Sequence, residues 1–106
     1  MIERVVLIKL NDNEANAEGR ARVANHSRRV LPLLPGVVSV SIGTPASAED
    51  AKSWDISIIV RFAQASDIPR YRDDPDHRAY VDQFLAPRMT FIKAWNFDIG
   101  EPLAGG

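Results

Sequence analysis

Four stretches of the chain have the length and the apolar, β-branched character that is typical of β-strands: residues 2–10, 37–44, 54–62 and 91–99. The third has the clearest alternation, with large apolar side chains at every second position: Trp54, Ile56, Ile58, Val60 and Phe62. Because successive residues of a strand point to opposite faces of the sheet, these side chains share one face. By the same parity, Arg4 lies among the core-facing Ile2 and Val6. In the last strand, we expect Trp95 on the face that meets the helices and Ile92 on the opposite face.

Helical spacing of small and apolar residues predicts a long helix between the first two strands, ending near residue 34. Its inner stripe is expected to be Ala17, Ala21, Ala24, Ser27, Leu31 and Leu34, with Val23 and Val30 on the flank. Gly19 should weaken this helix by roughly 1 kcal/mol relative to alanine. Pro32 should distort or end its last turn, because the proline ring clashes with the carbonyl group four residues earlier. His26 falls beside the stripe and is expected at the surface.

A second helical region is predicted after the third strand. A short helix should follow a cap at Ser66, and Asp74-Pro75 should begin another. Aspartate is a favoured N-cap and proline a favoured first helical residue. The inward stripe of this later helix is His77, Tyr80, Val81, Phe84 and Leu85.

The resulting order of elements, β-α-β-β-α-β, is that of a ferredoxin-like α+β fold with a four-stranded antiparallel sheet. Two helical segments cannot cover both faces of this sheet, so we expect them on one face. The other face would then expose a set of apolar residues: Val5, Leu7, Ile59, Ile92 and Ala94. Such a patch usually marks an interface, so a homodimer joined through the sheet is expected. The alternative is a mixed face that tolerates water, because polar residues also lie on it: Lys9, Ser57, Arg61 and Asn96.

Length and composition agree with one soluble domain at residues 1–100, followed by a flexible tail at residues 101–106. The 106 residues are 45% hydrophobic and 25% charged, which is ordinary globular composition. A net charge of -1 without a basic stripe argues against nucleic acid as a partner. The first strand is too short to span a membrane and does not have the features of a signal peptide. The sequence contains no cysteine, which excludes disulfides and thiolate metal sites and fits a cytoplasmic protein.

The order and spacing of five segments resemble the stress-responsive A/B barrel (Dabb) family of dimeric α+β barrels. The segments are Ile2 to Leu10, Leu34-Pro35-Gly36-Val37-Val38-Ser39-Val40, Trp54-Asp55, Tyr71-Arg72-Asp73-Asp74-Pro75-Asp76-His77 and Trp95-Asn96-Phe97-Asp98. The resemblance covers nearly everything from residue 2 to residue 99. It implies that two copies pair their sheets as a dimeric α+β barrel.

The family includes plant stress proteins and a polyketide cyclase that closes a ring by intramolecular aldol condensation without metal or cofactor. The resemblance implies a pocket between helices and sheet in which a tyrosine and a histidine act together. Tyr71 and His77 stand at the matching positions, with the same six-residue separation. In two places the sequence departs from the family, since Arg4 and Asp74 stand where histidine is common.

The residues themselves support His77 and Tyr71 as candidate catalytic groups. His77 points inward, where a neutral imidazole could act as a general base on an acidic C–H or O–H group, or could be a hydrogen-bonded core residue. The helix dipole favours its neutral form, whereas the neighbouring Asp73, Asp74 and Asp76 favour its charged form. Tyr71 could donate a hydrogen bond to a substrate carbonyl group, or could cover the core with its hydroxyl in water.

Five further residues are candidates for binding a small apolar or carbonyl-containing ligand: Arg4, Ser27, Trp54, Tyr80 and Trp95. Arg4 either pairs with a carboxylate at the sheet edge or binds an anionic group of a ligand. The small side chain of Ser27, opposite the two tryptophans, leaves room for a ligand cavity or for a close helix contact. The aspartates before His77 are not expected to bind a metal, because Asp74 is better used as an N-cap.

Three functions remain open at this point. The first is a cofactor-independent enzyme of the cyclase or lyase type that uses His77 and Tyr71. The second is a non-catalytic ligand-binding or stress-related dimer. The third is a cofactor-free monooxygenase of the related antibiotic-biosynthesis barrels, and fold alone does not choose among them.

Overall fold

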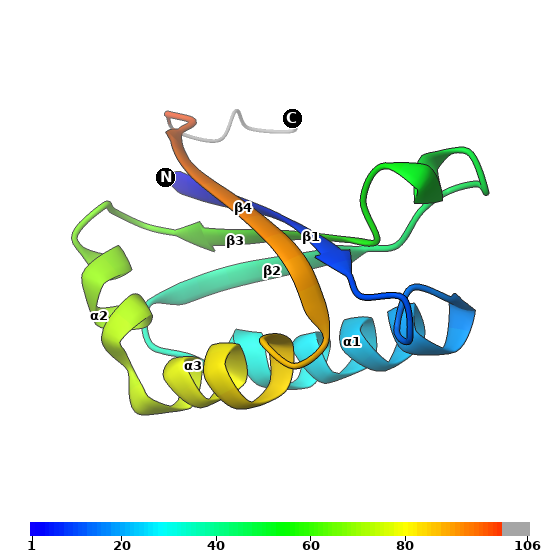
Figure 1. Ribbon diagram of the computed structural model, residues 1–106. Helices are drawn as coiled ribbons and strands as arrows, with labels where there is room; N and C mark the ends of the chain where they lie inside the picture. Colours follow the sequence, from blue (N-terminus) through cyan, green and yellow to red (C-terminus); the bar gives the residue numbers. More distant parts are fainter. Residues whose placement is uncertain (101–106) are drawn as a thin grey trace.

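The β-α-β-β-α-β order predicted from the sequence is confirmed in the computed structural model, which describes residues 1–100 (Figure 1). The strands are β1 (Ile2–Leu10), β2 (Val37–Gly43), β3 (Ile56–Phe62) and β4 (Met89–Asp98), and the helices are α1 (Ala17–Val30), α2 (Asp67–Asp73) and α3 (Pro75–Ala79). Two short 3-10 turns, η1 (Leu31–Leu33) and η2 (Asp50–Lys52), and a π-helical segment, η3 (Tyr80–Leu85), complete the elements. The tail predicted at residues 101–106 lies outside the described residues.

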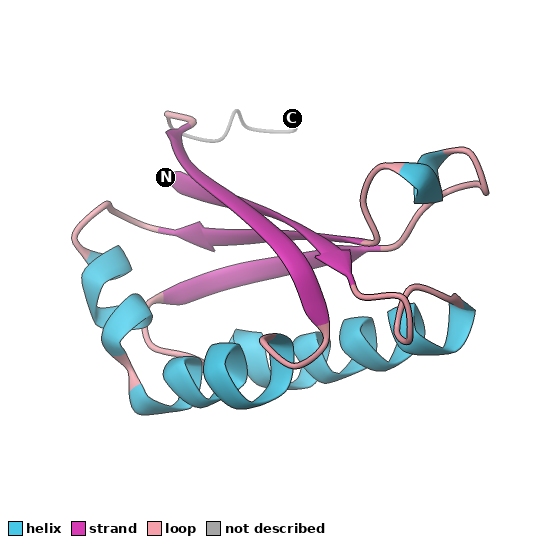
Figure 2. Cartoon of the chain, viewed as in Figure 1, coloured by secondary structure: helices cyan, strands magenta, loops and turns pink. Residues whose placement is uncertain are grey.

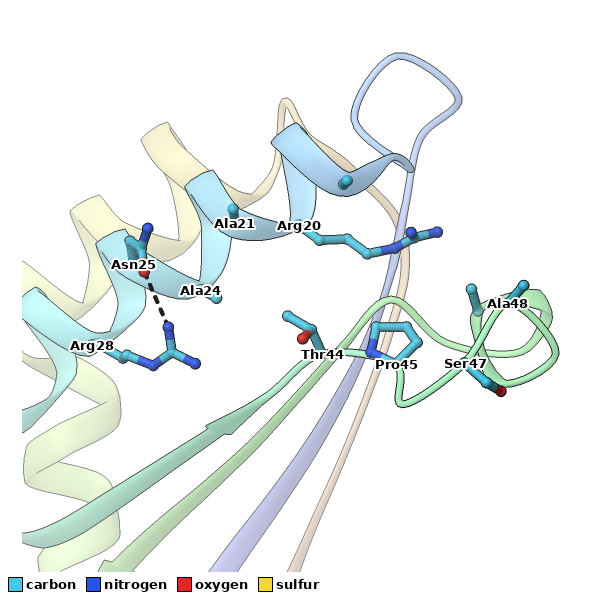
Figure 3. Close-up of a pocket in the computed structure, with 11 residues that line it drawn as sticks. Arg20, Ala21, Ala24, Asn25, Arg28, Thr44, Pro45, Ser47 and Ala48 are labelled. Atoms are coloured by element: carbon cyan, nitrogen blue, oxygen red, sulfur yellow. Dashed lines mark hydrogen bonds between the residues drawn. The ribbon is translucent and has the colours of Figure 1, made fainter.

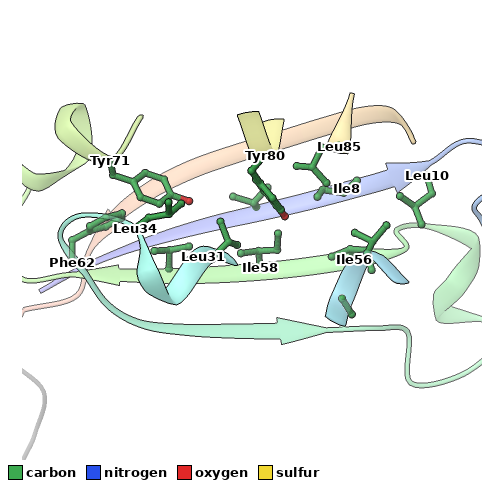
Figure 4. Packing of buried hydrophobic residues seen from close by; sticks show 14 of the residues in the cluster. Ile8, Leu10, Leu31, Leu34, Ile56, Ile58, Phe62, Tyr71, Tyr80 and Leu85 are labelled. Carbon is green, nitrogen blue, oxygen red and sulfur yellow. The ribbon is translucent and has the colours of Figure 1, made fainter. Parts of the chain in front are cut away.

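The helices α1, α2 and α3 all lie on one side of an antiparallel sheet whose strand order is β2-β3-β1-β4 (Figure 2). The hydrophobic core fills the space between them (Figure 4). The predicted parities of β1 and β3 are confirmed, because the buried residues are Ile2, Val6, Ile8, Leu10, Ile56, Ile58, Val60 and Phe62. Each large apolar side chain buried here stabilises the fold by about 1.5–3 kcal/mol, so this layer holds the sheet against the helices.

The inner stripe of α1 differs from the prediction in its first two turns. Ala17 and Ala21 are exposed, and the buried residues of the helix are Gly19, Val23, Ala24 and Ser27. The helix begins against the preceding loop, where a Cβ atom on Gly19 would overlap the backbone carbonyl oxygen of Glu14. Glycine therefore permits this close approach, in addition to its cost in helix propensity. At the other end, the α-helix stops at Val30 and the turn that contains Pro32 is 3-10, as its proline predicted.

The register of β4 shows that its two faces were assigned the wrong way round. Val5 pairs with Trp95, and Ile8 pairs with Ile92. Directly paired residues of adjacent strands point to the same face. Trp95 therefore lies on the outer face with Val5, and Ile92 lies on the helix-facing side. The assignment had placed the larger aromatic residues inward, but β4 is an edge strand that keeps them exposed: Phe91 is 61%, Trp95 45% and Phe97 52% accessible.

The third strand begins at Ile56 rather than at Trp54 because Asp55 turns its side chain inward. Its carboxylate accepts a hydrogen bond from the backbone N–H of Leu10 at 2.8 Å and another from Nε of Arg20 at 3.0 Å. Asp55 is only 1% exposed, and these charge-assisted bonds compensate its burial. The sequence parity had placed Asp55 on the outer face, so this link between β1, α1 and β3 was not predicted.

The predicted cap at Ser66 is wrong in its mechanism. Ser66 directly precedes α2, but its backbone is already helical, with φ -65° and ψ -14°, and its side chain makes no capping hydrogen bond within residues 1–100. A capping side chain normally requires an extended backbone at that position.

Candidate functional site

The candidate site is a pocket of about 250 Å³ between the helix-facing side of the sheet and the segments α2, α3 and η3. Four of the predicted site residues line it: Arg4, Tyr71, His77 and Tyr80. Most of the remaining wall is apolar and consists of Val6, Leu31, Ile58, Val81, Leu85 and Ile92. The side chains of Tyr71 and Tyr80 extend from the helical layer towards the sheet (Figure 4). The pocket thus places potential acid–base groups in largely apolar surroundings.

The position of His77 is set by the start of α3. The carboxylate of Asp74 accepts hydrogen bonds from the backbone N–H groups of Asp76 at 2.9 Å and of His77 at 3.3 Å, which confirms Asp74 as the N-cap. His77 is 9% exposed, and its ring Nδ1 lies 3.1 Å from the backbone carbonyl oxygen of Arg72. A carbonyl oxygen only accepts, so Nδ1 donates and carries the proton of the neutral ring. This assigns the lone pair of the neutral imidazole to Nε2.

The protonation of His77 is decided by its burial. Burial in the pocket lowers the pKa of His77 below its ordinary value, and the charges of Arg4 and Arg78 lower it further. The hydrogen bond to the Arg72 carbonyl and the charge of Asp74 act in the opposite direction without reversing the shift. The sequence showed influences of opposite sign on the charge of His77, and in the structure the lowered pKa favours the neutral form. At neutral pH the imidazole is available as a base.

Tyr71 faces His77 across a short gap. The two ring centroids are 4.3 Å apart with an angle of 43° between the planes, and the edge of the Phe62 ring contacts Tyr71 at a centroid distance of 5.0 Å. Burial raises the pKa of the Tyr71 hydroxyl above its ordinary range, Tyr80 raises it further, and Arg4 partly opposes the shift. Its raised pKa keeps this hydroxyl protonated, and within residues 1–100 it has no hydrogen-bond partner, so it can donate to a ligand.

Tyr80 and Ser27 form a buried pair behind the pocket wall. Ser27 Oγ donates a hydrogen bond to the Val23 carbonyl oxygen at 2.7 Å, so the Tyr80 hydroxyl at 2.6 Å is the donor to Ser27. Burial raises the pKa of Tyr80 to about 12. Ser27 is fully buried and does not line the pocket, so the geometry does not support its predicted contact with a ligand. Its small side chain makes room for the Tyr80 hydroxyl instead.

Among the described residues 1–100, Arg4 does not pair with a carboxylate, which was one of the two alternatives raised by the sequence. Its Nη1 donates a hydrogen bond at 3.0 Å to the side-chain oxygen of Asn96, the neighbouring residue on β4. Within residues 1–100, Arg4 forms no ion pair with an acidic side chain. The guanidinium lines the pocket and influences the pKa values of both Tyr71 and His77, which makes it an electrostatic part of the same site.

Comparison with known proteins supplies the family. The family model described as "Stress responsive A/B Barrel Domain" matches residues 2–95. The chain belongs to the stress-responsive A/B barrel (Dabb) family. The resemblance noted in the sequence is thereby confirmed. No curated protein matches the chain.

Solved structures of low sequence identity share the fold of this Dabb domain. A Dabb family protein with a ferredoxin-like fold from Mesorhizobium loti is 21% identical, with a TM-score of 0.75 and 97% of each chain covered. A dimeric ferredoxin-like protein of unknown function from Thermobifida fusca is 20% identical, with a TM-score of 0.76 over 92% of this chain and 90% of that one. A hydroxynitrile lyase from Passiflora edulis is 12% identical, with a TM-score of 0.75 over 97% and 96% of the two chains. These likenesses show a common fold.

Neither tryptophan of the Dabb domain lines this pocket, so their contact with a ligand stays a prediction. Trp54 precedes β3 and borders a separate hollow beside Gly43 and Asp50. Trp95 lies on the outer face through its pairing with Val5. Ile92 takes part in the pocket instead, because its register with Ile8 turns it inward.

Arg72 and Arg78 also line the pocket, and sequence reasoning missed them. Arg78 directly follows His77 in α3, and Arg72 supplies the carbonyl group that holds the imidazole. Their place beside Tyr71 and His77 in the chain was the available signal. Both side chains pair with carboxylates, Arg72 with Asp73 and Arg78 with Asp82, each at 3.2 Å.

A different hollow, of about 380 Å³, lies between α1 and the segment that follows β2 (Figure 3). Its walls combine small residues such as Ala21 and Ala24 with Arg20 and Arg28. Arg20 is bound to Asp55, and Arg28 donates a hydrogen bond to Asn25 at 3.0 Å, drawn in Figure 3. No histidine or tyrosine lines this hollow. A larger hollow of about 530 Å³ between α1 and η3 is lined in part by His26, Tyr80 and Asp76, but it is the pocket around His77 that brings Tyr71 and His77 together.

His26 is half-buried, which corrects its expected place at the surface. Its ring stacks on Phe84 at a centroid distance of 3.8 Å, and the guanidinium of Arg88 lies 4.3 Å from the same Phe84 ring. Burial lowers the pKa of His26, as do the nearby charges of Arg29 and Arg88. The ring lines a separate hollow together with Tyr80 and Phe84, and it does not line the pocket of His77.

In the part of the chain that the structure describes, no three histidine, aspartate or glutamate side chains are grouped so as to hold a metal ion. Over the same residues, no helix combines the length and apolar character needed to cross a membrane.

Proposed function

We propose that this Dabb domain is a cofactor-independent enzyme of the cyclase or lyase type that acts on a small carbonyl compound. His77 is the general base and Tyr71 the hydrogen-bond donor. The observation that carries the proposal is the shared pocket, in which a neutral imidazole with its Nε2 lone pair lies 4.3 Å, ring to ring, from a protonated phenol.

The chemistry follows from the two protonation states. His77 Nε2 takes a proton from the carbon next to a substrate carbonyl group, and the electrons of the broken C–H bond move onto the carbonyl oxygen as an enolate. The Tyr71 hydroxyl donates a hydrogen bond to that oxygen as its negative charge develops. The enolate carbon then attacks a second carbonyl group of the same substrate, and the imidazolium returns its proton to the alkoxide that forms. The Arg72 carbonyl, which accepts from Nδ1, orients the ring throughout.

The apolar wall supports the same chemistry. Its side chains exclude water, and electrostatic interactions with a developing oxyanion are stronger in such surroundings than in bulk water. The name of the structural neighbour from Passiflora edulis, a hydroxynitrile lyase, supports placing an enzyme on this fold.

The proposal is tested by proton exchange at carbon, which needs no knowledge of the natural substrate. Acetylacetone and phenylacetone are incubated with the protein in D₂O, and deuterium incorporation next to the carbonyl group is followed by NMR. Wild type should exceed buffer, His77→Ala should lose about 10²–10⁴-fold of the catalysed rate, and Tyr71→Phe should lose part of it. Arg70→Gln is a suitable control, because Arg70 pairs with Asp67 outside the pocket. No exchange above buffer with wild type, or equal rates for wild type and His77→Ala, would favour a non-catalytic ligand-binding dimer.

We also propose that the domain works as a homodimer joined through the outer face of its sheet. The corrected register enlarges the apolar set on this face to Val5, Leu7, Ile59, Phe91, Trp95 and Phe97. Apolar patches of this kind usually mark an interface. The structural neighbour from Thermobifida fusca is described as dimeric, which supports the proposal. A cytoplasmic location is proposed as well, supported by a sequence without cysteine.

A further inference from the structure

We infer that the ligand of this pocket carries a carboxylate group and that Arg4 binds it, so that Arg4 determines the substrate class. The inference rests on the proposed function only for the choice of pocket and not for the reaction.

The pocket has a strong excess of positive charge. Three arginines line it, Arg4, Arg72 and Arg78, and among the described residues that line it none is acidic. Arg72 and Arg78 have carboxylate partners outside the pocket in Asp73 and Asp82. Arg4 contacts only the neutral amide of Asn96 within residues 1–100. Its charge is therefore the one that a ligand is best placed to balance.

The position of Arg4 makes this charge effective. It lies on β1, an inner strand of the sheet, on the same face as Ile2 and Val6. Arg4 as a residue is half-buried, and the partial burial of a charged side chain has a desolvation cost that an anionic partner offsets. Its planar donor groups match the two oxygens of a carboxylate in a bidentate arrangement, which a lysine or histidine does not reproduce.

The remaining walls of the pocket limit the polarity and the size of the rest of the ligand. Six apolar side chains line the pocket, so the body of the ligand is apolar. The volume of about 250 Å³ is below the roughly 300–1,000 Å³ that is usual for pockets that hold drug-sized molecules. A short-chain or single-ring carboxylate fits this description, with its carboxylate at Arg4 and its reactive carbon towards Tyr71 and His77.

The test compares phenylacetate with phenylacetamide, which have nearly the same shape and differ in charge. Binding of each is measured by NMR titration of backbone amide signals in wild type, Arg4→Gln, Arg4→Lys and Arg70→Gln. We expect wild type and Arg70→Gln to bind phenylacetate at least about tenfold more tightly than phenylacetamide, a difference of about 1.4 kcal/mol. Arg4→Gln should lose the preference, and Arg4→Lys should keep only part of it. Amide spectra that resemble the wild-type spectrum show that each variant is folded.

Several outcomes would overturn the inference: no binding of phenylacetate to wild type, equal binding of the two probes, or an unchanged preference in Arg4→Gln. The result is independent of catalysis, because His77→Ala should keep the carboxylate preference of wild type. Conversely, the exchange assay with the neutral acetylacetone tests His77 without involving a carboxylate. Failure of the proposed reaction and failure of the proposed ligand class are therefore distinguishable.

Discussion

Tyr71 and His77 face each other at a centroid distance of 4.3 Å because the helix is interrupted between them. In a continuous α-helix, side chains six positions apart point about 120° away from one another. Here α2 ends at Asp73, and Asp74 is extended with φ -61° and ψ 135° before Pro75 starts α3. The break turns both rings towards the same pocket. The residue before a proline disfavours helical geometry, so the Asp-Pro sequence is the local cause of the arrangement.

The first prediction concerns the cap that holds this break. Asp74→Ala removes hydrogen bonds to the N–H groups of Asp76 and His77 and should lower the free energy of unfolding by about 1 kcal/mol. Urea denaturation followed by circular dichroism measures the change. Asp73→Ala is the matched control, because its exposed ion pair with Arg72 contributes little. If both variants lose the same stability, the N-cap is not what holds the start of α3.

The second prediction is a pH dependence of stability caused by His77. Burial lowers its folded-state pKa from the ordinary 6.5, so the unfolded chain takes up a proton at a pH where the folded chain resists it. Relative to His77→Gln, wild type should therefore lose stability as the pH falls below about 6.5, by at most about 1.4 kcal/mol per pH unit. The difference should stop growing below the folded-state pKa.

Urea denaturation of wild type and His77→Gln across this pH range provides the measurement, and NMR titration of the His77 ring gives its pKa directly. His26→Gln is titrated in parallel, because burial lowers the pKa of His26 as well. A His77 pKa at or above 6.5 would contradict the burial argument.

The third prediction concerns the buried hydroxyl pair of Ser27 and Tyr80. Ser27→Ala leaves the Tyr80 hydroxyl without its acceptor and should cost about 1–3 kcal/mol. Tyr80→Phe removes the donor, and the double variant should cost less than the sum of the two single changes. A double-mutant cycle measured by urea denaturation gives this coupling. Strictly additive costs would show that the 2.6 Å contact contributes no coupling to stability.

The fourth prediction is a dimer that depends on the outer face of the sheet. Light scattering after size exclusion should give wild type about twice the 11.8 kDa mass of the chain. Trp95→Lys should shift the protein to monomer, because it places a charge within an apolar interface. Leu33→Lys is the control, since Leu33 is an exposed apolar residue (84%) in η1, which packs on the helical side of the sheet. A monomeric wild type at micromolar concentration would rule out the proposed dimer interface on the outer face of the sheet.

Local features of the sequence were sufficient for most of the fold, and the family resemblance indicated the centre of the site. The alternation in β1 and β3 identified the core-facing residues, because a strand with one buried face requires it. Asp74-Pro75 located a helix start, and the resemblance to the Dabb family pointed to Tyr71 and His77 as the groups that the structure brings together. The strand alternation and the helix start depend on periodicity and backbone preference, which a few neighbouring residues determine.

What the sequence left open depended on contacts between distant segments. The face on which Trp95 lies follows from its register with Val5, and an edge strand can keep large aromatic side chains exposed. Ser27 proved to be a partner of Tyr80, 53 residues away, rather than part of a cavity. The neutral state of His77 required the balance between burial and the charges around it. Arg4 donates a hydrogen bond to the side-chain amide of Asn96, because the register of β4 with β1 places Asn96 beside it. Periodicity orients a side chain relative to its own element, whereas register and helix docking decide what that side chain meets.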